Sequence, residues 1–328
     1  MDPVIECVGD PRAMGHCQGL AHRAVIQQHI VASGGKLGRS RWPTLAALTS
    51  GRELGRGTGR EVIRHYTHLA ERMAGIARNA DVSLASLMEL FKQSTSGAAP
   101  EDELVAAAVA VGARASEDAN GDPLVVRTLR GSSFEHSPWV LRRSRPEVGF
   151  ASAEITLPWL ATAVAGINAA GVAVAMAPRA ASYGGGVNAG AVNPRNAPHA
   201  VLLVQECLQR FEDISGCLDW CRKRPRSGNV SLIIADAAGH LARIEVVGTL
   251  CRIAELDPDF ALDGAEPKLE QDLRRHFGDR RQLDLAGLAS VGESMDRLAV
   301  WLEPRRRKLS IRSFDDDASA GKAIEIAL

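Results

Sequence analysis

The sequence predicts an α+β protein in which short apolar strands come in pairs, with helices between the groups of strands. Leu104–Val111 is a continuous run of small and β-branched apolar residues, typical of a strand covered on both faces. Asp118–Asp122 supplies turn residues, and a second strand starts at Pro123. Leu160–Val174 likewise predicts two strands, joined by a turn at Asn168–Gly171. Strands paired in this way indicate antiparallel sheets.

Length and composition favour one large domain. The chain has 328 residues, of which 45% are hydrophobic, enough for a substantial core. Lys and Arg together number 39, as do Asp and Glu, so the formal net charge is zero. Because the chain carries no net charge, we expect neither nucleic acid nor an acidic membrane as a partner.

The N-terminus and the cysteines indicate a reducing compartment. MDPVIECVGDP lacks a basic region followed by an apolar core, and no apolar run approaches the roughly 20 residues that span a bilayer. We therefore expect a cytoplasmic protein. Six scattered cysteines fit reduced, buried thiols better than a disulfide framework. Cys217 and Cys221 are four residues apart, but no second ligand pair has metal spacing, so we expect no metal and no cofactor.

The N-terminal part begins with a strand at residues 3–9 and a helix capped by Asp10, with Pro11 at its first position. The stretch from Leu37 to Gly59 is rich in Gly, Arg, Ser and Thr, and predicts an exposed loop, either a plain insertion or a lid. Glu61–Asn79 is the next expected helix. Its two histidines, three residues apart, fit an ordinary helix face better than a metal site.

A further helix is expected from its cap at Ser83 through Gln93, followed by a polar loop at Ser94–Glu103. The hydroxyl side chains at the start of this loop are candidate substitutes for a missing nucleophile. Gly97, Pro100 and three acids follow, however, and they fit a loop better than the buried strand that such a nucleophile begins.

The C-terminal half continues the alternation. A glycine-rich loop at residues 182–198 lacks the GxxxxGK[ST] arrangement of a phosphate-binding loop. Two amphipathic helices are expected at 198–211 and 213–223, and then a strand pair at 224–245. Two helical segments at 267–278 and 283–288 and a closing hairpin at 298–313 follow. The basic tip of the closing hairpin, Glu303–Arg307, is either a solvated turn or a site for an anionic partner.

Several of these segments together resemble one group of enzymes. The glycine-spaced opening Gly9–Gly19, the helix pair before the central hairpin, the segment Gly166–Val174 and the run Arg224–Gly239 follow its motifs in order. The group is the N-terminal-nucleophile (Ntn) hydrolases related to acyl-coenzyme A:6-aminopenicillanic acid (isopenicillin N) acyltransferase. The resemblance implies a four-layer αββα sandwich of two mostly antiparallel sheets. It also implies a single domain over residues 1–328, with a helical, pro-segment-like part at 1–103 and a sandwich core at 104–328.

In that family a Cys begins the first strand of the central hairpin, and autocleavage turns its own amino group into the general base. Here the position falls at Ala106, Ala107 or Ala108, and no Cys occurs between Cys17 and Cys207. An alanine methyl group can neither attack a carbonyl carbon nor cleave its own peptide bond. The resemblance therefore implies a chain without the family's nucleophile.

The residues that accompany the nucleophile differ as well. In the family's R-N-x-D segment, Thr128 replaces Asn and Arg130 replaces the carboxylate with a cation. Phe91 stands where the family often has Asn. An engineered replacement of the Cys alone would leave these companions in place. Loss of catalysis followed by drift would change several of them, as is seen here.

The resemblance also marks a ligand pocket. Asn229, beside Ser227, matches the Asn whose side-chain amide faces the developing oxyanion in the enzymes, although a role in forming a turn explains Asn229 equally well. Asn168 belongs to the family's G-x-N-x-x-G segment. Together with Thr128 and Arg130, these residues form the predicted pocket.

Two functions follow as hypotheses, because a fold does not carry a function without its site. The first is a catalytically degenerate homologue that binds a peptide, acyl or amide ligand, as a helper in a peptide or natural-product pathway. The second is an active amide hydrolase or N-acyltransferase with an acyl thioester as candidate donor. It requires either a Cys replaced by Ala in this sequence or chemistry moved to Cys17 or Cys207. A structural or oligomerisation role is a third hypothesis, and a homo-oligomer is left open.

Overall fold

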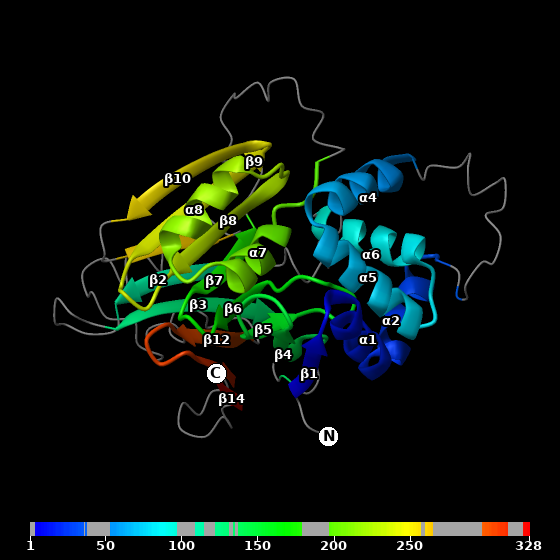
Figure 1. Cartoon of the computed structure of the whole chain (residues 1–328), viewed down its shortest axis with the longest axis horizontal. Helices are drawn as coiled ribbons and strands as arrows, with labels where there is room; N and C mark the ends of the chain where they lie inside the picture. Colours follow the sequence, from blue (N-terminus) through cyan, green and yellow to red (C-terminus); the bar gives the residue numbers. More distant parts are fainter. Residues whose placement is uncertain are drawn as a thin grey trace.

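The computed structural model describes residues 4–35, 37, 53–96, 109–114, 122–130, 134, 137–178, 197–256, 260–264, 297–313 and 324–328. Within them, two β-sheets pack face to face and helices pack around the sheets (Figure 1). The predicted α+β class with two mostly antiparallel sheets is confirmed.

Sheet A consists of eight strands in the spatial order β1 (Val4–Gly9), β4 (Val140–Pro146), β5 (Ser152–Thr156), β6 (Ala165–Asn168), β7 (Ala173–Pro178), β8 (Gly228–Ala235), β9 (Leu241–Gly248) and β10 (Leu250–Leu256). The edge strand β1 runs parallel to β4, and the remaining neighbours pair antiparallel. The start of the N-terminal part is therefore built into the sandwich. The predicted turn between β6 and β7 is confirmed by the hydrogen bond from Asn168 N to Val172 O.

Sheet B consists of six antiparallel strands in the order β11 (Phe260–Gly264), β2 (Val109–Arg114), β3 (Pro123–Arg130), β12 (Arg297–Glu303), β13 (Lys308–Ser313) and β14 (Ile324–Ala327). The predicted central hairpin is the pair β2 and β3, in which Ala110 lies opposite Arg127. The structure describes this hairpin from Val109 onward, so Ala106, Ala107 and Ala108 lie outside the described residues.

Helices α7 (Leu202–Arg210) and α8 (Ile214–Lys223) cover the outer face of sheet A, where α7 contacts β6 and β7 and α8 contacts β9 and β10. Within the described residues, these helices gather beside the sandwich (Figure 1): α1 (Pro11–Ala21), α2 (Arg23–Ala32), α4 (Glu53–His65), α5 (Thr67–Asn79) and α6 (Leu84–Ser96). The helices predicted at 267–278 and 283–288 lie outside the described residues.

Local capping chemistry places several helices where the sequence predicts them. The Asp10 carboxylate accepts a hydrogen bond from Ala13 N at 2.8 Å, with Pro11 at the first helical position. Ser83 Oγ accepts from Ser86 N at 3.0 Å, and Asp213 caps α8 in the same way. These caps satisfy backbone N–H groups that have no partner within the helix.

Two predictions about the helical part are wrong. Residues 53–59 belong to α4, not to the predicted loop, and the predicted single helix at Glu61–Asn79 is broken at Tyr66. The break has a physical reason. The Tyr66 ring is completely buried and its hydroxyl donates to Pro225 O at 2.9 Å, so Tyr66 leaves helical geometry to reach the α8–β8 connection.

The predicted loop at Ser94–Glu103 also begins too early. Ser94–Ser96 continue α6, and in this helical geometry the Ser94 and Thr95 hydroxyl groups donate to the carbonyl oxygens four residues back, Leu90 O and Phe91 O. Ser94 Oγ also accepts from Trp159 Nε1 at 2.8 Å, so it is a packed helix residue.

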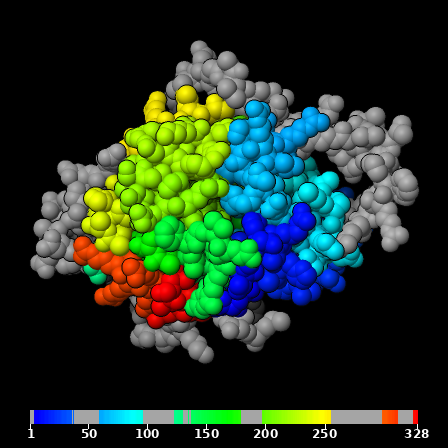
Figure 2. Space-filling view, viewed as in Figure 1, coloured from blue at the N-terminus to red at the C-terminus, as the bar shows by residue number. Residues whose placement is uncertain are grey.

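The helical cluster meets the sandwich where α1 packs on β1 and β4, and where α4 and α5 lie beside α7 (Figure 2). Figure 2 shows the yellow-green surface of the α7–α8 region next to the light-blue surface of α4. His68 Nε2 of α5 lies 3.0 Å from Glu206 Oε1 of α7, which joins the two parts. Among the described helices, none is long and apolar enough to cross a membrane.

Candidate functional site

Arg127 of β3 is a fully buried cation that extends from sheet B to sheet A. Its Nη1 donates to Val164 O at 3.3 Å and to Met176 O. Both are backbone oxygens: Met176 belongs to β7 of sheet A, and Val164 directly precedes β6. The Trp139 ring centre lies 6.0 Å from the guanidinium carbon. Within the described part of the chain, Nε and Nη2 have no hydrogen-bond partner. Burial lowers the pKa of Arg127 to about 9, so the side chain stays charged at neutral pH.

This arrangement suits an oxygen-rich ligand. A buried cation is costly unless its N–H groups are paired, and guanidinium N–H groups pair best with carboxylate or carbonyl oxygens. Arg127 was not among the predicted pocket residues. The available signal was a lone basic residue inside the apolar run PLVVRTL, where an unpaired charge would be unfavourable.

Asn229 lies near the start of β8 and is exposed. Its Oδ1 accepts from Gly248 N at 3.3 Å, so the Nδ2 group points its hydrogens elsewhere. Strand alternation places Asn229 on the face of β8 opposite to Val230, Leu232 and Ile234.

That face is the one directed toward sheet B. Ile234 pairs with Val174, which pairs with Gly166, and a Cβ atom at Gly166 would lie 2.8 Å from the Leu208 side chain of α7. Ile234 thus faces α7, and Asn229 faces the space between the sheets. The carbonyl oxygen of Met176 accepts a hydrogen bond from Arg127, and Met176 pairs with Leu232 of β8. Leu232 lies three residues after Asn229, a distance of about 10 Å along the strand.

The polar side-chain atoms of two other predicted pocket residues, Asn168 and Ser227, form hydrogen bonds with backbone groups. Asn168 is completely buried; its Nδ2 donates to Leu208 O at 3.0 Å and to Phe211 O at 2.8 Å. Its Oδ1 accepts from Ala170 N and Val172 N. Ser227 Oγ donates to Ala197 O at 2.8 Å. By strand register Asn168 lies about 20 Å from Asn229 along the sheet, so the two do not share a site.

Thr128 is buried and follows Arg127 in β3, so its side chain points to the opposite face of sheet B. The side chain of Arg130 lies outside the described residues, as do Ala106, Ala107 and Ala108. Of the predicted pocket residues whose side chains are described, Asn229 is the one that faces the same inter-sheet space as Arg127.

The cysteines considered as relocated nucleophiles differ in access. Cys207 is fully buried, and a hydrogen bond with Cys217 together with burial raises the pKa of its thiol. A buried thiol with a raised pKa is a poor nucleophile. Cys17 is half-buried on α1. Among the described residues, no group of three or more His, Cys, Asp or Glu side chains has the geometry to hold a metal ion.

A buried polar network on the outer face of sheet A fixes β4 and β5 beneath the helices. Arg142 Nε donates to Glu154 Oε2 at 2.6 Å, and its Nη1 and Nη2 donate to Gln18 Oε1 and Gln205 Oε1. Burial alone would raise the pKa of Glu154, but the cations of Arg142 and Arg72 hold it below its ordinary value. The network links α1, α5 and α7 to sheet A, so its role is to position the scaffold.

Comparison with known proteins gives a fold likeness and no family assignment. No protein-family model matches the sequence. No curated protein matches it either. Solved structures with a similar arrangement include penicillin V acylase from Agrobacterium tumefaciens, at 12% identity and TM-score 0.42, covering 67% of this chain and 86% of that one.

Two further structures are comparable. The N-acylethanolamine-hydrolyzing acid amidase orthologue of Caenorhabditis elegans has 11% identity and TM-score 0.43, with 67% of this chain and 99% of that one covered. A mutant conjugated bile acid hydrolase from Clostridium perfringens has 10% identity and TM-score 0.42, with 66% and 92% covered. At this level, the likeness establishes neither activity nor substrate for this chain.

Proposed function

We propose that this protein is a catalytically degenerate relative of the Ntn hydrolases of the isopenicillin N acyltransferase type, and that it binds a peptide, acyl or amide ligand between its two sheets. The observation that carries the proposal is the absence of any Cys between Cys17 and Cys207, a stretch that contains the whole central hairpin. A chain without the nucleophile keeps the sandwich but loses the acyl-transfer step.

The inter-sheet space retains groups that bind without reacting. Arg127 offers N–H groups to a carboxylate or carbonyl oxygen, and the amide of Asn229 faces the same space. Neither side chain is a nucleophile. A protein with these two groups and no nucleophile is suited to hold an acylated peptide or amide, as a helper in a biosynthetic pathway would.

The test is binding of N-octanoylglycine, which combines an acyl chain, an amide and a carboxylate. We expect saturable binding by isothermal titration, and we expect Arg127→Met to weaken it at least tenfold, because a charge-assisted hydrogen bond is lost. Arg127→Lys should retain part of the affinity. The matched control is Arg143→Met, since Arg143 is a partly exposed arginine of sheet A paired with Glu6.

Hydrolysis separates this proposal from the active-enzyme alternative. Release of glycine from N-octanoylglycine by the purified protein would contradict the proposal and restore the hypothesis of an amide hydrolase. Unaltered binding by Arg127→Met would show that the ligand lies elsewhere, even if no hydrolysis occurs.

A further inference from the structure

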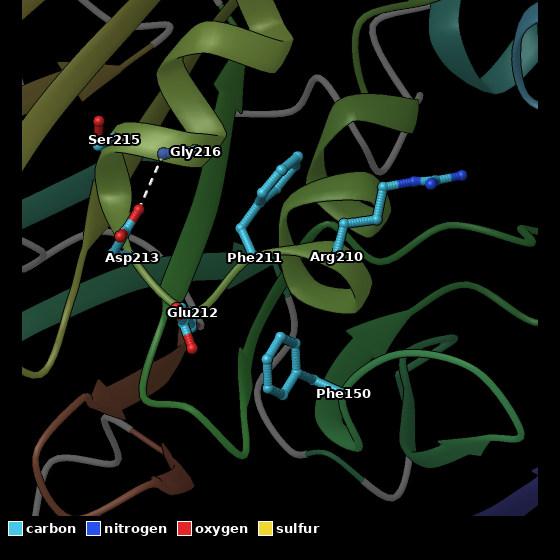
Figure 3. Close-up of a pocket in the computed structure, with 7 residues that line it drawn as sticks. All are labelled: Phe150, Arg210, Phe211, Glu212, Asp213, Ser215 and Gly216. Atoms are coloured by element: carbon cyan, nitrogen blue, oxygen red, sulfur yellow. Dashed lines mark hydrogen bonds between the residues drawn. The ribbon is translucent and has the colours of Figure 1, made fainter.

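A pocket lies on the outer side of sheet A, where α7 ends and α8 begins. It has a volume of about 440 Å³ and is lined by Phe150, Arg210, Phe211, Glu212, Asp213, Ser215 and Gly216. Figure 3 shows the rings of Phe150 and Phe211 on two sides of the opening, with Glu212 beside them. Both rings are half-buried, so each keeps part of its surface open to a ligand.

The walls of this pocket are held in place by hydrogen bonds from the sandwich. Phe150 N donates to Gln209 O at 3.0 Å, which ties the turn before β5 to the end of α7. Asn168 Nδ2 donates to Phe211 O at 2.8 Å, and Ile214 N donates to the buried Asp236 carboxylate at 3.3 Å. A pocket whose backbone is already fixed loses little conformational entropy when a ligand binds.

A glycine and a helix cap also fix the backbone around this pocket. Gly149 has φ of +107°, and a Cβ atom there would lie 2.3 Å from Gln209 O, so the turn that carries Phe150 requires glycine. Asp213 Oδ1 accepts from Gly216 N at 2.8 Å and caps α8 (Figure 3). The pocket is therefore a built feature of the α7–α8 connection.

The charge at the opening is negative. Arg210 is a lining residue, but its Nε lies 2.8 Å from the buried carboxylate of Glu206 and its guanidinium carbon lies 4.9 Å from the Trp220 ring centre. The Glu206 carboxylate, one turn earlier on α7, offsets the charge of Arg210. Glu212 is exposed and has no hydrogen bond or ion pair with a described residue, and Asp213 adds a second carboxylate.

Two aromatic rings beside an exposed carboxylate, that of Glu212, which has no ion-pair partner among the described residues, are the chemistry that recognises an organic cation. The negative face of an aromatic ring attracts an alkylated ammonium group, and a nearby carboxylate adds Coulomb attraction. We propose that this pocket binds a small alkylated ammonium ligand, with its methyl groups against Phe150 and Phe211 and its charge opposite Glu212. The proposal does not depend on the function of the inter-sheet site.

The probe is choline, and its neutral isostere 3,3-dimethylbutan-1-ol is the comparison ligand. Trp220 serves as the reporter, because its ring lies 5.8 Å from that of Phe211. We expect a saturable change in tryptophan fluorescence with choline, with a Kd on the order of 10 mM or tighter for an open pocket. The neutral alcohol should bind at least fivefold more weakly, and high salt should weaken choline binding.

Variants identify the groups responsible. Phe150→Leu keeps apolar volume but removes the aromatic face, and should weaken choline binding about fivefold while leaving binding of the alcohol unchanged. Glu212→Gln should weaken choline binding at least threefold. Glu71→Gln, at an exposed glutamate of α5, is the matched control and should have no effect. Equal affinity for the two ligands, no saturation, or full affinity in Glu212→Gln would overturn the proposal.

Discussion

Replacing Glu154 with Gln should remove much of the free energy that holds β4 and β5 beneath the helices. The carboxylate is completely buried. It accepts hydrogen bonds from Arg142 Nε, Ser144 Oγ, Ser152 Oγ and Gln205 Nε2, at 2.6, 3.1, 2.5 and 2.6 Å. In the variant, one of its two oxygens becomes an NH2 group that faces donors, and Arg142 loses its counter-charge.

The magnitude follows from the burial. Removing one partner of a buried ion pair costs about 3–5 kcal/mol, because the other charge is left unpaired in a medium of low dielectric constant. An unfolding entropy of about 2.1 cal/mol/K per residue converts 4 kcal/mol into a decrease in Tm on the order of 6 °C for a chain of this length. The assay is denaturant and thermal unfolding of Glu154→Gln at pH 7, followed by circular dichroism.

Glu245→Gln is the matched control, because Glu245 also lies in sheet A and pairs with Arg243 at 3.0 Å, but both side chains are partly exposed. It should cost less than about 1 kcal/mol. A loss below about 1 kcal/mol for Glu154→Gln would refute the reasoning that the buried network fixes the scaffold.

Three further predictions concern the scaffold. A Cβ atom at Gly15 would lie 2.1 Å from Arg72 O, so Gly15→Ala should separate α1 from α5 and cost about 3 kcal/mol or more in the free energy of unfolding. Gly59→Ala in α4, where the nearest atom to the new Cβ is Met88 Cε of α6 at 3.9 Å, should instead stabilise by about 0.5–1 kcal/mol, and denaturant unfolding compares the two. Asp10→Ala should cost about 1 kcal/mol by the same assay, and no loss would exclude its capping role. Burial lowers the pKa of His199 to about 4, whereas an unfolded His has a pKa of about 6.5, so the unfolded state binds the proton first. Neutral His199 therefore contributes fully to the free energy of unfolding above about pH 6.5, and this contribution is lost as the pH falls toward 4. Between pH 7 and pH 4, the free energy of unfolding of His199→Gln should fall by about 3 kcal/mol less than that of the wild type. Unfolding curves for the wild type and the variant at both pH values test this, and parallel slopes would contradict it.

Local signals in the sequence predict the elements whose cause is local. The cap at Asp10, the cap at Ser83 and the β6–β7 turn each depend on a few neighbouring residues, and the structure confirms all three. The break at Tyr66 and the helical Ser94 depend on Pro225 and Trp159, which are distant in sequence. No helical periodicity contains that information.

For the candidate site, too, motifs in the sequence single out residues, but they miss contacts that depend on distant parts of the chain. Asn229 is named by a motif, and strand alternation places it on the face of β8 toward sheet B, while its role in a pocket stays a prediction. Asn168 belongs to an equally clear motif, but the structure uses its amide to hold the α7–α8 connection. Arg127 was not predicted as a site residue. The alternation of a strand indicates which residues are buried, but it does not indicate which buried polar groups lack a hydrogen-bond partner.

The most direct test of the central claim, that the chain binds without catalysis, is its mass under denaturing conditions after incubation with p-nitrophenyl octanoate. An active nucleophile would cleave the chain, or would take the octanoyl group from the ester with release of p-nitrophenolate, and then either keep it as an adduct or pass it to water as octanoate. We expect one uncleaved, unmodified chain near 35.0 kDa. Two fragments with a break between Ser94 and Val109, or a stable octanoyl adduct, would show that this protein still carries a working nucleophile.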